Sequence, residues 1–273
     1  MVSDFSSFSG FRFSDPAGAD WLGLVGASGC RFVHSTGYED VSYPPGVTLA
    51  EDDEPFAFQV FGKAMIFRKQ GRPLEFDGDF NSPTFVEKTT SDSDTEDGLI
   101  PCPDSPFGLY FRNRLAVLNK ADSPTTVIFS DLLDSDTFSR TTGEFFLNKG
   151  TSDETRALAP YLEDQVIVFN RRSIHLINGI ATLDSSTYEV TRQYGMAGNR
   201  AWAQSGPYTY FVSNEGDIQI LTPQQNPAKG LGIAISKVAS ESIPLSRPNR
   251  STMEQVSRAH LGEAQAVAFN GLF

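Results

Sequence analysis

Residues 165–177 read QVIVFNRRSIHLI. Two short apolar runs rich in β-branched residues flank the polar tripeptide Asn170–Arg172, and this pattern is typical of two antiparallel strands joined by a tight turn. Asn suits such a turn because it tolerates a positive φ. The stretch therefore predicts a β-hairpin.

Similar units recur along the chain. Each has an apolar strand with an aromatic residue at or near its end, a turn and a second apolar strand; they span residues 58–67, 108–118, 165–177, 208–221 and 266–273. The aromatic residues nearest the turns are 50, 58, 42 and 58 residues apart, and they are Phe61, Phe111, Phe169, Phe211 and Phe269. A repeat of about 40–60 residues with one antiparallel sheet per repeat is typical of β-propeller blades.

The composition agrees with an all-β chain. The 273 residues include 22 Phe, 23 Gly and 16 Pro, and only 21% are charged; strands and turns favour aromatic residues, Gly and Pro. Apolar residues in the segment 251–264 have helical spacing, and Pro248 precedes it. The sequence therefore predicts an all-β, β-propeller-like array of antiparallel hairpins or blades, with one short helix near the C-terminus.

We expect two regions along the chain. Residues 1–57 form an N-terminal β segment, either a blade or part of a platform, and residues 58–273 form the propeller region. The acidic run 89–98 (TTSDSDTEDG) is predicted to be an exposed loop, and residues 223–230 (PQQNPAKG) a turn-rich linker. The last unit has only two residues after its Asn270–Gly271 turn. The propeller region is therefore expected to be incomplete at its C-terminal end and to continue in a longer polypeptide.

Charge and composition exclude several classes of protein. The formal net charge of −12 argues against a free-standing nucleic-acid binder and against docking on anionic lipid. The chain has no apolar run long enough to span a membrane, and its first residues do not form a secretory signal. Cys30 and Cys102 are predicted to be free, buried thiols of a protein made in a reducing cytosol.

No catalytic, cofactor-binding or metal-ligating residue is nominated. His34, His175 and His260 are far apart in the sequence, which argues against a histidine-rich metal site. Counted from Asp92, the acidic run has Gly98 one position too late for an EF-hand loop, so a solvated loop is favoured and cation binding stays open. The glycine-rich residues 23–29 fit neither a phosphate-binding loop nor a nucleophile elbow, and no Ser/His/Asp set can be singled out.

A tripeptide that occurs twice in the chain, which we call the Ser–Asp echo, indicates structural turns. Residues 13–15 (FSD) recur as residues 129–131, and we expect the aromatic residue to pack between blades and the Ser–Asp pair to close a turn. Ser14, Gly18 and Trp21 also match the spacing of the Asp-box of sialidase-type propellers, but the Asp is one position early. A sialidase would also need a cluster of three arginines, which the sequence does not reveal.

Four sets of runs resemble a known family when taken in order. They are residues 64–68 with 71–78, 114–117 with 127–134, 166–169 with 173–177 and 194–195, and 210–213 with 215–218. They resemble the propeller region of tail nozzle proteins, also called tail tubular protein B-like proteins, of short-tailed bacteriophages. The resemblance spans roughly residues 58–221 and 259–273. No catalytic motif of that family matches the chain.

The resemblance implies a non-enzymatic structural protein of the virion, made in the host cytoplasm. Members form a hexameric ring below the portal and adaptor, and double-stranded DNA passes through the axial channel. An acidic channel would repel phosphate and let DNA slide. In the simpler alternative, the charge of −12 only keeps the subunit soluble before assembly.

Two rival functions stay open. A carbohydrate- or receptor-binding propeller at the tail tip could stack sugars on Trp21, Tyr43, Trp202 or Tyr208, although packing is the simpler role for most of these residues. A sialidase-like glycoside hydrolase is the less favoured rival, because one fold hosts many functions and the catalytic residues are not recognisable.

Overall fold

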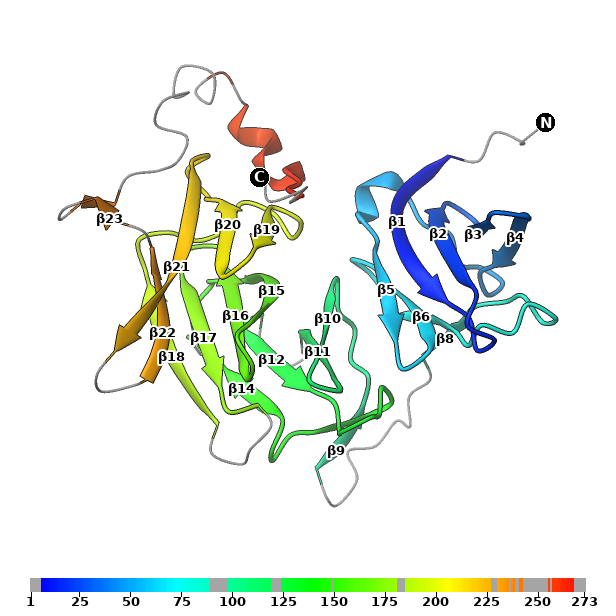
Figure 1. Cartoon of the computed structure of the whole chain (residues 1–273), viewed down its shortest axis with the longest axis horizontal. Helices are drawn as coiled ribbons and strands as arrows, with labels where there is room; N and C mark the ends of the chain where they lie inside the picture. Colours follow the sequence, from blue (N-terminus) through cyan, green and yellow to red (C-terminus); the bar gives the residue numbers. More distant parts are fainter. Residues whose placement is uncertain are drawn as a thin grey trace. The chain divides into compact units, whose positions relative to one another are not determined.

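A computed structural model gives the fold of the chain (Figure 1). The structure describes residues 6–88, 98–118, 124–148, 150–180, 185–226, 230–235, 237–238, 241–242, 255 and 257–267. These residues divide into two compact units, Met1–Phe145 and Phe146–Phe273. The domain boundary predicted between residues 57 and 58 stays a prediction.

Three four-stranded sheets belong to the first unit, and most of their strands are labelled in Figure 1. The first sheet has the order β1 (Ser7–Ser14), β2 (Asp20–Gly26), β3 (Gly29–His34) and β4 (Gly37–Ser42). The second has the order β5 (Phe56–Val60), β6 (Lys63–Phe67), β7 (Leu74–Phe76) and β8 (Val86–Glu87). The third has the order β10 (Gly108–Phe111), β11 (Arg114–Leu118), β12 (Thr126–Phe129) and β14 (Glu144–Phe146), whose last residue begins the second unit. A separate pair, β9 (Leu99–Pro101) with β13 (Thr137–Ser139), is antiparallel.

Two further four-stranded sheets belong to the second unit. One has the order β15 (Thr155–Tyr161), β16 (Gln165–Asn170), β17 (Ile174–Asn178) and β18 (Ser186–Thr191). The other has the order β19 (Trp202–Ser205), β20 (Tyr208–Val212), β21 (Ile218–Asn226) and β22 (Gly230–Ile235). A short pair, β23 (Lys237–Val238) and β24 (Glu241–Ser242), follows. Successive four-stranded antiparallel sheets of this kind confirm the predicted β-propeller-like array.

The blade repeat is more regular than the aromatic residues indicate. The second strands of the five sheets begin at residues 20, 63, 114, 165 and 208, which are 43, 51, 51 and 43 residues apart. The predicted units at 58–67 and 108–118 join first and second strands, whereas those at 165–177 and 208–221 join second and third strands. The uneven spacing of the turn aromatics therefore arises because these residues occupy different positions in their blades.

Two hairpins have turns that need positive φ at both central residues. Phe61 and Gly62 have φ values of 49° and 81°, and Arg112 and Asn113 have values of 52° and 57°. Positive φ at both positions is the requirement of the type I′ turn, whose twist matches the twist of the flanking strands. Gly62 and Asn113 meet this requirement at little steric cost.

The inner strands bury both faces. Along β6, Ala64 and Ile66 belong to a core shared with the first sheet, whereas Met65 and Phe67 belong to a core shared with the third sheet. Because side chains alternate between the faces of a strand, one strand supplies both cores. In the first of these cores, the Phe32 ring lies 5.2 Å from Phe13 and 5.4 Å from Phe76, between centroids.

Several local predictions need correction. Residues 223–226, predicted as linker, belong to β21, and residues 227–229 lie outside the described part. Pro223 is tolerated there because β21 pairs with β20 only up to Leu221, so the missing N–H is not needed on that side. The predicted helix 251–264 is a 3-10 helix, η3 (Arg258–Glu263), within its described residues. In the last predicted hairpin, Ala266 and Val267 are not in a strand, and residues 268–273 lie outside the described part.

The predicted free, buried cysteines are confirmed. Cys30 and Cys102 are 1% and 2% exposed and form no disulfide. Burial raises the pKa of Cys102 to about 12 and also raises that of Cys30. Among the described residues, no helix has the length and apolar character that crossing a bilayer requires.

Candidate functional site

The four aromatic residues nominated for sugar stacking do not form one site. Tyr43 is buried, and its hydroxyl donates to the Gly26 carbonyl at 3.0 Å. Trp21 is half-buried against His34 and Phe80. Trp202 packs against the core of the second unit, whereas Tyr208 is exposed. Tyr43 is therefore excluded as a sugar platform, and packing accounts for Trp21 and Trp202.

The first copy of the Ser–Asp echo forms a structural turn. Asp15 accepts hydrogen bonds from the Ala19 amide at 2.8 Å and the Trp21 indole at 3.1 Å, and Ser14 donates to Asp20 at 2.6 Å. The amide and indole bonds lower the pKa of Asp15. The Asp15 carboxylate thus stabilises the β1–β2 turn, although Asp15 lies one residue before the position that the Asp-box motif requires.

In the second copy of the echo, the serine hydroxyl links the end of β12 to β11. Ser130 accepts a hydrogen bond from the Leu115 amide at 2.8 Å and donates to the Asp131 carbonyl at 3.0 Å. The aromatic residues differ in their packing: Phe13 reaches Phe76 of the next sheet, whereas Phe129 contacts Phe145 of its own sheet. Packing between blades is therefore confirmed for the first copy alone.

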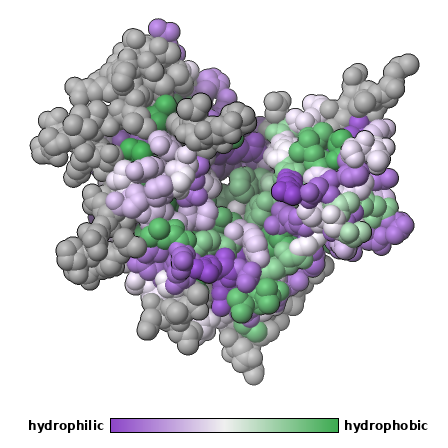
Figure 2. Space-filling view, in the orientation of Figure 1, coloured by the Kyte–Doolittle hydropathy of each residue, from purple (hydrophilic) through white to green (hydrophobic). Residues whose placement is uncertain are grey.

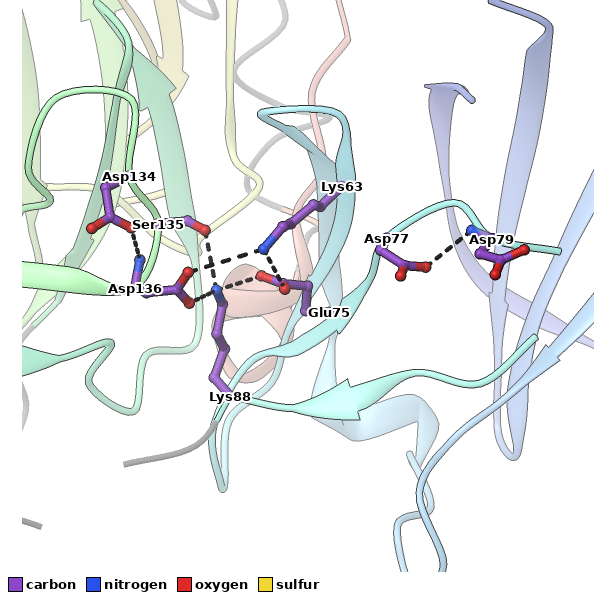
Figure 3. Close-up of polar contacts among 8 residues, drawn as sticks. All are labelled: Lys63, Glu75, Asp77, Asp79, Lys88, Asp134, Ser135 and Asp136. Atoms are coloured by element: carbon purple, nitrogen blue, oxygen red, sulfur yellow. Dashed lines mark hydrogen bonds and ion pairs between the residues drawn. The ribbon is translucent and has the colours of Figure 1, made fainter. Parts of the chain in front are cut away.

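A charged cluster joins the second sheet to the loop before β13. We call Lys63, Glu75, Lys88, Ser135 and Asp136 the Lys88 cluster (Figure 3). The Lys88 ammonium contacts Glu75 and Asp136 and donates to Ser135 Oγ at 3.1 Å; Lys63 pairs with the other Glu75 oxygen at 2.7 Å. Asp77 and Asp79 form a separate contact away from the cluster (Figure 3).

The cluster neutralises a buried cation. The Lys88 side chain is 5% exposed and that of Glu75 is 11% exposed. Burial alone would lower the pKa of Lys88, but hydrogen bonds to Asp136 and Glu75 outweigh it and raise that pKa. The Asp136 amide donates to Asp134 at 2.7 Å, which fixes the loop that carries the anion. Since the Lys88 ammonium pairs with two carboxylates and donates to a hydroxyl, we interpret the cluster as a structural one that fixes the loop to the sheet.

Replacing Lys88 by Met should reduce the free energy of unfolding by about 2–3 kcal/mol, because the buried Glu75 carboxylate loses its closest cation. Chemical denaturation measures the loss. The double variant Lys88→Met/Glu75→Leu should recover part of it, since no unpaired buried charge is then left.

The matched control is Lys69→Met. Lys69 has a half-exposed side chain 3.7 Å from Glu54, and removing an exposed ion pair should change the stability by less than about 0.5 kcal/mol. Equal losses for Lys69→Met and Lys88→Met would contradict the role of the Lys88 cluster.

A second polar network lies in the second unit. We call Asn148, Asp153, Asn170, Ser173 and His175 the Ser173 network. Ser173 Oγ donates to Asp153 Oδ2, accepts from Asn170 Nδ2 at 3.1 Å and lies 2.9 Å from His175 Nε2. Asn148 Nδ2 lies 3.2 Å from Ser173 Oγ and 3.1 Å from His175 Nε2. The network fastens the segment after β14 to the β16–β17 hairpin.

This grouping of Ser, His and Asp differs from a catalytic triad. In a triad, His lies between Ser and Asp and takes the hydroxyl proton. Here Ser173 lies between the other two, its hydroxyl proton is directed to Asp153, and amide groups of Asn148 and Asn170 occupy its lone pairs. Ser173 is also only 2% exposed. The arrangement suits a structural hydrogen-bond network, in which each buried polar group has a partner.

Burial lowers the pKa of His175, and Arg192 acts in the same direction, whereas Glu189 and Asp153 oppose the shift. The folded chain therefore favours the neutral imidazole. Because the unfolded chain takes up a proton near pH 6.5 and the folded chain does not, the stabilisation is present above that pH and is lost as the pH falls.

The free energy of unfolding should therefore decrease as the pH is lowered from 7 to 5, by at most about 1.4 kcal/mol per pH unit from His175. His175→Gln should remove that part of the slope in denaturant titrations. His260→Gln is the control, because His260 is exposed beside Glu263. An unchanged slope in His175→Gln would contradict the role of the buried neutral histidine.

Sequence reasoning missed both networks. Ser173 and His175 stand two apart on one hairpin arm, a spacing that puts both side chains on one face, and this signal was available. Lys88, Glu75 and Asp136 have no such signal, since their contact depends on how the second sheet meets the loop before β13.

Metal binding has no candidate in the described part of the chain, where no three His, Cys, Asp or Glu residues are grouped to hold an ion. The acidic run at residues 89–97 lies outside that part. Its expected exposure and any cation binding there stay predictions.

Comparisons with known proteins give similarity at the level of fold. No protein-family model and no curated protein matches the chain. A streptogramin B lyase structure is 12% identical, with a TM-score of 0.46, over 85% of this chain and 69% of that one. The virginiamycin B lyase from Staphylococcus aureus is 11% identical, with a TM-score of 0.48, over 85% and 70%. A β-propeller domain from Myceliophteria thermophila is 8% identical, with a TM-score of 0.46, over 85% and 72%. At this similarity no activity or substrate carries over.

Proposed function

We propose that the chain is a structural, non-enzymatic subunit of a bacteriophage tail, a tail tube or nozzle protein that forms a ring through which DNA is ejected. In this proposal the ring is hexameric, lies below the portal and adaptor in the virion, and contacts double-stranded DNA only in transit. The subunit is made in the host cytoplasm.

One observation supports the proposal most directly. The runs that carry the resemblance to tail nozzle proteins each include residues of central strands, in four successive sheets. They include β6 and β7, then β11 and β12, then β16 and β17, and finally β20 with the first residue of β21, whereas residues 130–134, 194–195 and 215–217 of the runs lie between strands. The strand residues of the resemblance therefore recur once per blade.

The described polar networks are compatible with a structural role. The Lys88 cluster and the Ser173 network use their charges and hydroxyl groups on one another, which fixes loops onto sheets. A rigid blade array offers edges that a neighbouring copy can contact, and closed cyclic symmetry repeats one such contact around a ring. The net charge of −12 would disfavour adhesion of DNA phosphates.

The alternative function, a carbohydrate- or receptor-binding propeller, is less well supported by the structure than by the sequence. Among its four nominated aromatics, Tyr208 alone is exposed, with 41% of its surface accessible. Stacking of sugars needs an accessible ring face, so the rival would have to rely on other residues.

Electron microscopy of the purified chain, alone and mixed with portal–adaptor complexes of the phage that encodes it, tests the proposal. We expect six-fold rings that add one layer to those complexes, because a ring below the portal must match its symmetry axis. Portal–adaptor complexes without the chain provide the control.

A different result would contradict the proposal. It fails if the chain stays monomeric in light scattering at every concentration tested and never joins the complexes. Binding to glycans that contain no uronic acid, or turnover of a fluorogenic glycoside, by the same preparation would favour the rivals instead.

A further inference from the structure

The second unit has a surface hollow beside the Ser173 network. Its volume is about 270 Å³, and the side chains that form its walls are Asn148, Thr151, Ser152, Arg172 and Arg192. Asp153 and Ser173 also line it. The hollow lies where the segment after β14 meets the β16–β17 hairpin and the residue after β18. This volume is slightly below that of pockets for drug-sized ligands, and it suits a single small molecule.

The base of the lining, at Thr151 and Asp153, is held in place before any ligand arrives. Asp153 Oδ1 accepts from the Arg172 amide at 2.7 Å, and Asp153 Oδ2 accepts from the Ser173 hydroxyl. Thr151 Oγ1 donates to the Asn148 carbonyl at 2.8 Å. Polar groups that are already fixed lose little conformational entropy on binding, which favours affinity at these two residues.

The guanidinium groups of Arg172 and Arg192 favour an anionic ligand in the hollow. Arg172 is exposed, and its side chain has no ion-pair or hydrogen-bond partner among the residues that the structure describes. Arg192 donates to Glu189 through Nε, which leaves its two terminal nitrogens for a ligand. A guanidinium forms paired hydrogen bonds with a carboxylate. An anionic group therefore fits at this wall.

The other lining groups indicate the rest of the ligand. Each Asp153 oxygen has one identified bond and a further lone pair, which suits acceptance from a ligand hydroxyl. The Ser152 and Thr151 hydroxyl groups add polar contacts. Because the Asp153 carboxylate would repel a second concentrated negative charge, a ligand with one carboxylate and several hydroxyl groups suits the hollow better than a phosphate.

We propose that this hollow binds one uronic acid unit, a sugar ring with a carboxylate. The carboxylate contacts Arg172 and Arg192, and ring hydroxyl groups contact Asp153 and Ser152. The site is independent of the role in a tail ring, and it uses none of the four aromatic residues nominated from the sequence.

Saturation-transfer NMR on the full chain tests the site with glucuronate and glucose, which differ in the carboxylate. We expect saturation transfer to glucuronate and none to glucose at the same concentration. Arg172→Gln and Arg192→Gln should each weaken glucuronate binding roughly tenfold, the size expected for loss of a hydrogen bond to a charged group. Arg171→Gln is the matched control, because Arg171 is a neighbouring exposed arginine that does not line the hollow.

Three results would overturn the proposal. Equal transfer to glucose would show that the carboxylate is not recognised, and equally strong competition by inorganic phosphate would show a general oxyanion site. A loss in Arg171→Gln as large as in Arg172→Gln would show non-specific attraction. Thermal unfolding of each variant establishes that it is folded, and none of these results depends on ring assembly.

Discussion

The structure depends on strands that bury both of their faces. β6 and β11 show this, because consecutive residues of these strands are all but fully buried and their side chains point to opposite sides. A sheet with two apolar faces needs a neighbour on each. In the first unit the second sheet meets this need between the first and third sheets, with Ile66 in one core and Met65 in the other. The blade-by-blade repeat follows from this requirement.

Two-sided burial also limits where charge can lie. An ion among packed sheets must be paired and hydrogen bonded, because its desolvation is costly. In the Lys88 cluster, two carboxylates and a hydroxyl surround the Lys88 ammonium. In the Ser173 network the buried ion is the Asp153 carboxylate, which accepts hydrogen bonds from the Arg172 amide and the Ser173 hydroxyl. On the face shown in Figure 2, hydrophilic and hydrophobic residues gather in separate small patches. Chemistry that is open to ligands is therefore found at loops and turns, such as the hollow lined by Arg172.

The fold class was predictable from local signals. Apolar runs and turns at 58–67 and 165–177 define hairpins without knowledge of tertiary contacts. The position of each hairpin in its blade was not predictable, because first–second and second–third hairpins share one pattern. Pro223 indicated a linker although it lies in a strand, since the sequence does not show which edge of β21 is paired. Of the candidate sites, only the Ser173–His175 pair could be predicted from the sequence, because the two residues are two positions apart. The contacts of Lys88 and the position of Arg172 near Arg192 depend on the tertiary structure.

Chemical denaturation of Met65→Ala and Ile66→Ala tests two-sided burial most directly, because these adjacent β6 residues face different cores. Both side chains are fully buried, so each substitution should reduce the free energy of unfolding by about 2–5 kcal/mol. If either substitution changes the stability by less than about 0.5 kcal/mol, as at a surface position, one face of the sheet is exposed and the account is wrong.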